Sequence, residues 1–151
     1  MKRLLAVLLI FCLIPVVSFA DLRDLQEALF GSYLDIYGLS PDYSLIRQDA
    51  LTIITAKDYF VTLNYDSENN VTSALLAYNK KLDYNFIGYG TCLINSFFGK
   101  DYLLPYLNAL STFHGDELKL ATTDDLTGLV AISIDESGRP CFYVKSGTVI
   151  E

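Results

Sequence analysis

The chain predicts an α+β fold: an antiparallel sheet of about five to six strands, in two meander or hairpin blocks, with three helices packed on one face. Between Leu51 and Tyr78, three runs rich in β-branched and aromatic residues follow one another with only short polar breaks. Consecutive strands joined by tight turns pair antiparallel, whereas a parallel sheet needs a helix between its strands. Segments with a helical period flank this block, and strand-like residues return near the C-terminus.

Residues 1–20 have the pattern of a cleaved signal peptide. Two basic residues open the chain, an uncharged apolar run follows, and Ser-Phe-Ala places small residues at the expected positions before Asp21. We therefore expect an exported protein, secreted or periplasmic, whose residues 21–151 form one α+β domain. The alternative is an uncleaved membrane anchor, because the apolar run is at the lower limit of the length that spans a bilayer.

The chain is acidic, with 18 Asp and Glu against 11 Lys and Arg and a net charge of −7 at pH 7. Apart from Lys80-Lys81, its basic residues are dispersed. Such a surface repels phosphate backbones and anionic lipid headgroups. We therefore expect no nucleic-acid partner and, after removal of the leader, no membrane partner. Composition does not indicate the oligomeric state.

The first helix is predicted over residues 21–38, with Gly38 and Pro41 as its end signals. The apolar residues that recur at helical intervals are Leu22, Leu25, Leu29, Tyr33 and Ile36. They form one stripe, which we expect to cover the sheet, while the polar Arg23 and Glu27 lie off it. Residues 40–48 are either a connector or a short edge strand.

Tyrosine is abundant, with 11 copies and no tryptophan. Its apolar ring and polar hydroxyl suit an exposed binding surface, and they equally suit a core position with the hydroxyl at the rim. In the run 59–65, alternation places Tyr59 and Tyr65 on one face of the sheet. If a tyrosine-bearing face binds a partner, we expect Tyr59, Tyr65 and Tyr78 to form it.

Two further helices are predicted over residues 86–98 and 102–113. The apolar stripe of the first consists of Phe86, Tyr89, Leu93 and Phe97. Strand-like residues return at 117–122, 126–134 and 139–145, and the Ser-Gly dipeptide before the last of these is typical of a hairpin turn.

Two cysteines, Cys92 and Cys141, follow the leader. An even number of cysteines in an exported chain favours one disulfide between them. The alternative is two separate buried thiols that pack as small apolar side chains.

No motif indicates a catalytic residue, a metal site or a cofactor. His114 is the only histidine, and the acidic pairs, such as Asp124-Asp125, fall in predicted turns without the spacing of an EF-hand. The favoured function is therefore an exported non-enzymatic binding or inhibitor-like module that uses a sheet face or loops against a protein or glycan. The alternatives are a small secreted hydrolase that uses His114 and loop carboxylates, and a structural or assembly protein of the cell envelope.

Overall fold

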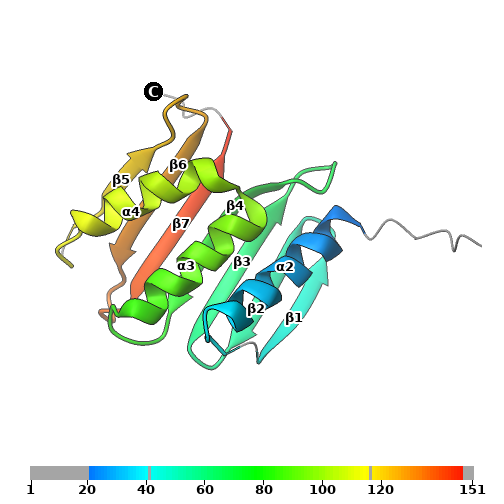
Figure 1. Ribbon diagram of the computed structural model, residues 1–151, viewed down its shortest axis with the longest axis horizontal. Helices are drawn as coiled ribbons and strands as arrows, with labels where there is room; N and C mark the ends of the chain where they lie inside the picture. Colours follow the sequence, from blue (N-terminus) through cyan, green and yellow to red (C-terminus); the bar gives the residue numbers. More distant parts are fainter. Residues whose placement is uncertain (1–20, 41, 116, 148–151) are drawn as a thin grey trace, which may run out of the picture.

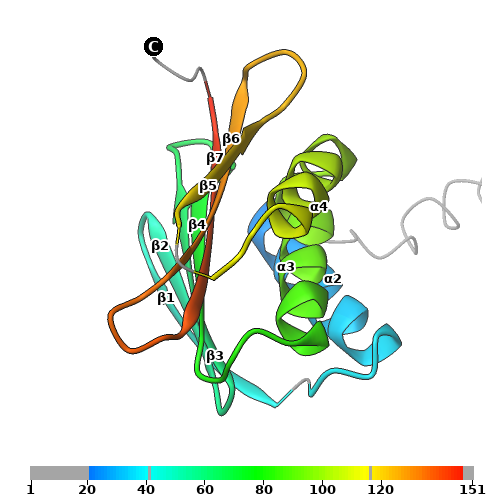
Figure 2. The same cartoon turned by 90° about the vertical axis from the view of Figure 1, so that its left-hand side faces the viewer.

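The computed structural model describes residues 21–40, 42–115 and 117–147. Within these ranges, seven strands form one antiparallel sheet, and three α-helices cover one of its faces (Figures 1 and 2). This is the α+β fold expected from the sequence, with slightly more strands than predicted. The expected leader lies outside the described residues.

The helices are α2 (Leu22–Ile36), α3 (Tyr84–Phe97) and α4 (Leu103–Ser111), and a short 3-10 turn, η1 (Lys100–Tyr102), precedes α4. The strands are β1 (Tyr43–Gln48), β2 (Leu51–Ala56), β3 (Tyr59–Tyr65), β4 (Val71–Tyr78), β5 (Lys119–Thr122), β6 (Gly128–Ile134) and β7 (Pro140–Ser146). The segment that the sequence left undecided is thus the edge strand β1.

Two meanders meet in the middle of the sheet. The spatial order is β1-β2-β3-β4-β7-β6-β5, so each meander runs from one edge toward the centre (Figure 1). The two meanders join where β4 pairs with β7, from Ser73 opposite Lys145 to Ala77 opposite Cys141. Every other pairing joins strands that are consecutive in the chain, which explains why local strand patterns predicted most of the sheet.

The core lies between the sheet and the helices. Every second strand residue points into the core from the sheet, as in β3, where Tyr59, Val61, Leu63 and Tyr65 are buried. Helix α3 supplies its predicted stripe, because Phe86, Tyr89, Leu93 and Phe97 are all buried. Figure 2 shows the three helices on one side of the sheet, so the other face carries no helix.

The packing of α4 against α3 depends on Gly90. Tyr106 of α4 is fully buried, and its hydroxyl donates toward the carbonyl oxygens of Phe86 (3.2 Å) and Ile87 (3.3 Å). The Tyr106 ring also packs on Phe142 of β7, with 4.5 Å between the ring centroids. A Cβ atom at position 90 would overlap the Tyr106 hydroxyl, so only glycine leaves room for this contact.

We expect Gly90→Ala to lower the free energy of unfolding by about 1–3 kcal/mol, measured by urea denaturation. Overpacking against a fully buried ring outweighs the advantage of about 1 kcal/mol that alanine has over glycine within a helix. Gly88→Ala is the matched control, because its Cβ would meet a methyl group of the Leu39 side chain at 2.9 Å, which can move aside. A Gly90→Ala protein as stable as the Gly88→Ala protein would contradict this account.

Candidate functional site

The three tyrosines predicted as a binding surface lie in the core. Tyr59, Tyr65 and Tyr78 are all buried beneath the helices, where no partner reaches them. The Tyr59 ring packs against Tyr89 of α3 at 4.4 Å between centroids, and the Tyr78 hydroxyl donates to Asp83 at 3.0 Å. Burial raises the pKa of Tyr59 and Tyr78 above the usual value. The expectation of a tyrosine binding face was therefore wrong, and these residues stabilise the core.

The predicted disulfide is not formed, because both Cys92 and Cys141 are free. Cys92 lies in α3 and is fully buried. Cys141 directly precedes the buried Phe142 in β7, so its side chain points to the face of the sheet that carries no helix. Side chains on opposite faces of a sheet are not placed to form a bridge. Burial raises the pKa of the Cys92 thiol to about 12, so this residue is not a ready nucleophile.

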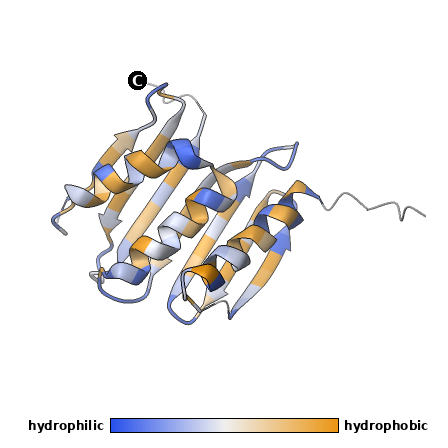
Figure 3. Cartoon of the chain, viewed as in Figure 1, coloured by the Kyte–Doolittle hydropathy of each residue, from blue (hydrophilic) through white to orange (hydrophobic). Residues whose placement is uncertain are grey.

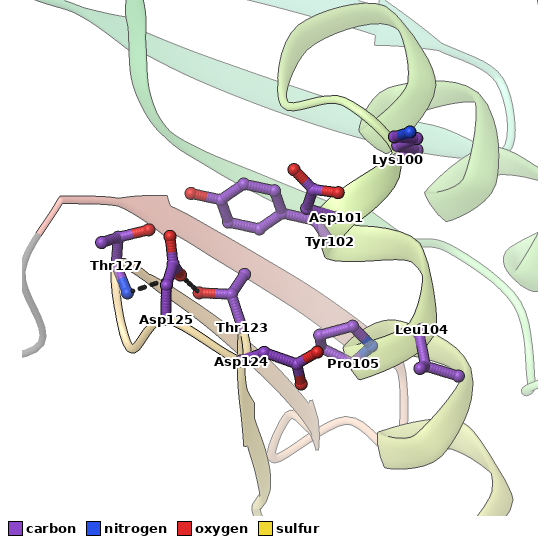
Figure 4. Close-up of a pocket in the computed structure, with 9 residues that line it drawn as sticks. All are labelled: Lys100, Asp101, Tyr102, Leu104, Pro105, Thr123, Asp124, Asp125 and Thr127. Carbon is purple, nitrogen blue, oxygen red and sulfur yellow. Dashed lines mark hydrogen bonds between the residues drawn. The ribbon is translucent and has the colours of Figure 1, made fainter.

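His114 is exposed just beyond α4, and it does not line the open cleft beside η1. This cleft, of about 370 Å³, lies between η1 and the β5–β6 turn, and Asp101, Tyr102, Asp124 and Asp125 are among its lining residues (Figure 4). In the ranges that the structure describes, no group of three or more His, Cys, Asp or Glu side chains has the arrangement of a metal site.

Asp125 lines this cleft, but its carboxylate is hydrogen-bonded within the β5–β6 turn. Its carboxylate accepts hydrogen bonds from the Thr123 hydroxyl at 2.7 Å and from the backbone N–H of Thr127 at 3.1 Å (Figure 4). These hydrogen bonds lower the pKa of Asp125 to about 2. The carboxylate is therefore kept ionised as a turn acceptor, which does not suit it to act as a general acid near neutral pH.

Helix α2 faces the sheet with a different side from the one predicted. Its buried residues are Arg23, Glu27, Phe30 and Leu34. Four residues of the predicted stripe are exposed, namely Leu22, Leu25, Leu29 and Ile36, and Tyr33 is only partly buried. The exposed fraction reaches 52% for Leu25 and 75% for Ile36. The expectation that this stripe covers the sheet was wrong, because two charged residues occupy the buried side instead.

The buried charges belong to what we call the Arg23–Glu27 cluster, formed by Arg23, Glu27, Arg47, Thr52 and Tyr65. Arg23 is 8% exposed and Glu27 only 4%. The guanidinium of Arg23 donates to the Thr52 hydroxyl at 3.0 Å, and it lies 4.3 Å from the centre of the Tyr65 ring. It also donates to three carbonyl oxygens of the β1–β2 hairpin, those of Gln48, Asp49 and Leu51.

The carboxylate of Glu27 accepts its hydrogen bonds from Thr52 and Arg47. The Thr52 hydroxyl, which accepts from Arg23, donates to Glu27 Oε1 at 3.0 Å, and Arg47 Nε donates to Oε2 at 2.8 Å. Arg47 also pairs with Asp24 on the surface at 2.6 Å. Buried charges are tolerated when they are paired and hydrogen-bonded in this way. The cluster thus joins α2 to β1, β2 and β3 and has a structural role.

The face of the sheet opposite the helices, which we call the open face, carries a mostly apolar row across all seven strands, interrupted by Thr62 in β3. Following the register from one edge to the other, the row reads Ile46, Ile53, Thr62, Leu75, Tyr143, Ala131 and Leu120. A second row contains Phe60, Ala77 and Cys141. None of the seven described strands contains Asp or Glu, and the only charged strand residue on the open face is Lys145.

Comparison with known proteins does not assign this chain to a family: no family model, curated protein or solved structure matches it. Over the part of the chain that the structure describes, no helix has both the length and the apolar character needed to cross a membrane.

The Arg23–Glu27 cluster makes a testable contribution to stability. Glu27→Ala leaves Arg23 buried without its carboxylate, and removal of one partner from a buried pair costs about 3–5 kcal/mol of unfolding free energy. Asp24→Asn is the control, since Asp24 is half exposed and surface pairs contribute about 0–1 kcal/mol. Urea denaturation measures both variants, and a Glu27→Ala cost as small as that of Asp24→Asn would refute the structural role of the cluster.

Proposed function

We propose that this chain is an exported, non-enzymatic binding protein that holds a protein partner on the open face of its sheet. The observation that supports the proposal is the apolar row across the seven strands, in a chain whose net charge is −7. An antiparallel sheet with one face in water normally alternates apolar residues inward and polar residues outward. Here the outward positions also carry Ile, Leu and Tyr.

Side chains of the row are accessible at both edges of the sheet and partly accessible at its centre. Ile46 and Leu120 are exposed at the two edges of the sheet, and Leu75 and Tyr143 are half-buried between them. Contiguous apolar surface of this kind marks interaction sites on soluble proteins. A sheet or a pair of helices from another protein packs against such a face at about 10 Å. A protein partner fits this face better than a glycan, because the row offers few hydrogen-bonding groups.

Acidic residues lie in the turns at both ends of the strands: Asp49, Asp58, Asp66, Asp125 and Asp135. Asp58 is paired with Lys80 and Asp135 with Arg139, so Asp49, Asp66 and Asp125 are the carboxylates of this set without an ion pair among the described residues. A partner with an apolar centre and a basic rim complements this arrangement. Such rim charges affect orientation and the rate of association more than affinity.

The proposal is tested with the double variant Leu75→Thr/Tyr143→Thr. Both residues are half-buried at the centre of the row, and threonine is a good strand former, so the fold should persist. The immobilised protein is first used to recover a partner from envelope and extracellular extracts. Affinity for that recovered partner is then measured, and we expect the double variant to bind it at least about tenfold more weakly.

Leu104→Ser is the control, because Leu104 is an exposed leucine of α4 on the other side of the molecule. Unchanged affinity of the double variant, or an equal loss with Leu104→Ser, would contradict the proposal. An assembly role predicts that the recovered partner is an envelope component present in stable complex with this protein. Robust turnover in a broad hydrolase screen that is lost on His114→Ala would instead assign an enzyme.

A further inference from the structure

Helix α2 presents a second apolar surface, on the side of the molecule away from the open face. We call it the α2 stripe, and it consists of the apolar Leu22, Leu25, Leu29 and Ile36, with the polar Ser32 between the last two. These residues are all exposed and recur at intervals of three and four, as the inner positions of a coiled-coil helix do. Figure 3 shows apolar positions recurring along α2 within the helical layer.

Helix α2 cannot rotate to bury the α2 stripe against the sheet without breaking the Arg23–Glu27 cluster. Turning it toward the sheet would withdraw Arg23 and Glu27 from Thr52 and Arg47, which supply their hydrogen bonds. Unpaired buried polar and charged groups are costly. The Arg23–Glu27 cluster therefore keeps the stripe on the surface of the part of the chain that the structure describes, where it is open to a partner.

One flank of the stripe carries acidic residues at its two ends. The residues that precede the stripe residues by one position are Asp21, Asp24, Ala28, Gly31 and Asp35, and they lie along the same side of the helix, with Asp21 at its N-cap. Arg47 neutralises Asp24, whereas Asp21 and Asp35 are exposed near the two ends of the stripe. Among the residues of α2, the only basic side chain is Arg23, which is buried. The residues on the other flank, Gln26 and Tyr33, are uncharged.

We propose that the α2 stripe is the docking site for an amphipathic helix of another protein that carries Lys or Arg along one flank of its apolar face. In helix pairs, the apolar positions supply the buried area, and the flanking charges select the partner. The stripe of a 15-residue helix is about 22 Å long, which matches about four turns of an incoming helix.

The acidic flank argues against the two other simple occupants. A second copy of this chain would bring another acidic flank and no accessible basic residue on α2 to pair with it. An anionic lipid surface would repel the same carboxylates. A basic helical partner is the occupant whose charge complements the stripe.

Fluorescence anisotropy with the purified protein tests the proposal. The probe is a labelled 18-residue peptide of Leu and Lys with Leu at heptad inner positions. The two control peptides replace Lys by Glu or scramble the order so that no apolar face forms. We expect the Leu–Lys peptide to bind at least about tenfold more tightly than either control and to weaken as salt rises.

Protein variants locate the binding site. Leu25→Ser/Leu29→Ser should weaken binding of the Leu–Lys peptide at least about tenfold, because it removes the centre of the stripe. Asp21→Asn/Asp35→Asn should reduce the salt dependence, and asparagine keeps the helix cap that Asp21 provides. Leu104→Ser and the open-face variant Leu75→Thr/Tyr143→Thr should leave the affinity unchanged, which separates this proposal from the previous one.

Equal affinity for the Leu–Lys and Leu–Glu peptides would overturn the proposal, as would an equal loss with Leu104→Ser. Two further measurements identify a different occupant. If sedimentation shows a dimer that Leu25→Ser/Leu29→Ser dissociates, the stripe binds a second copy and the proposal fails. If the wild-type protein binds vesicles of anionic lipid and the same variant does not, the stripe binds lipid and the proposal fails.

Discussion

The orientation of α2 depends on the Arg23–Glu27 cluster. Arg23 requires the Thr52 hydroxyl and the carbonyl oxygens of the β1–β2 hairpin, and Glu27 requires Thr52 and Arg47. Only one rotation of the helix about its axis meets both requirements. Burial of apolar area drives the helix onto the sheet, but it is the need to pair two buried charges that selects the face. The exposed α2 stripe follows from that selection.

Because the cluster fixes the orientation of α2, the molecule has two exposed surfaces with different properties. On one side of the molecule, the open face is almost uncharged and spans both meanders (Figure 2). On the other side, the α2 stripe is narrow and flanked by carboxylates at Asp21 and Asp35. A buried ion pair adds little net stability compared with apolar residues of the same shape, so its value here lies in specifying orientation. Under our two proposals, each of these surfaces binds a different partner.

Local patterns predicted the elements that local chemistry decides. Alternation in residues 59–65 identified β3, and the stripe from Phe86 to Phe97 identified the buried side of α3. The orientation of α2 was missed because periodicity counts apolar residues and places charges outside. The sequence did contain one signal: Arg23 and Glu27 are oppositely charged, lie four residues apart and share a side of the helix with Phe30 and Leu34. Its partners, Thr52 and Arg47, are distant in sequence, so no local pattern includes them.

The candidate site was predicted less well than the fold. Tyrosine suits core and surface equally, so the side of the sheet that the helices cover could not be read from Tyr59 or Tyr78 alone. Alternation does place Phe60 and Thr62 on the opposite face, which is where the open face lies. The predicted disulfide was wrong for a similar reason. The position of Cys141 in the alternation of β7 places it on the open face, and the number of cysteines in the chain does not indicate which face a cysteine occupies.

Hydroxyl-radical footprinting of the wild-type protein, read residue by residue by mass spectrometry, tests the central claim most directly. The claim is that α2 buries Arg23 and Glu27 and turns its leucines outward. We expect oxidation of Leu25, Leu29 and Ile36 and protection of Phe30 and Leu34. Phenylalanine is intrinsically reactive, so its protection would reflect burial. Protection of Leu25 and Leu29 together with oxidation of Phe30 would contradict the account.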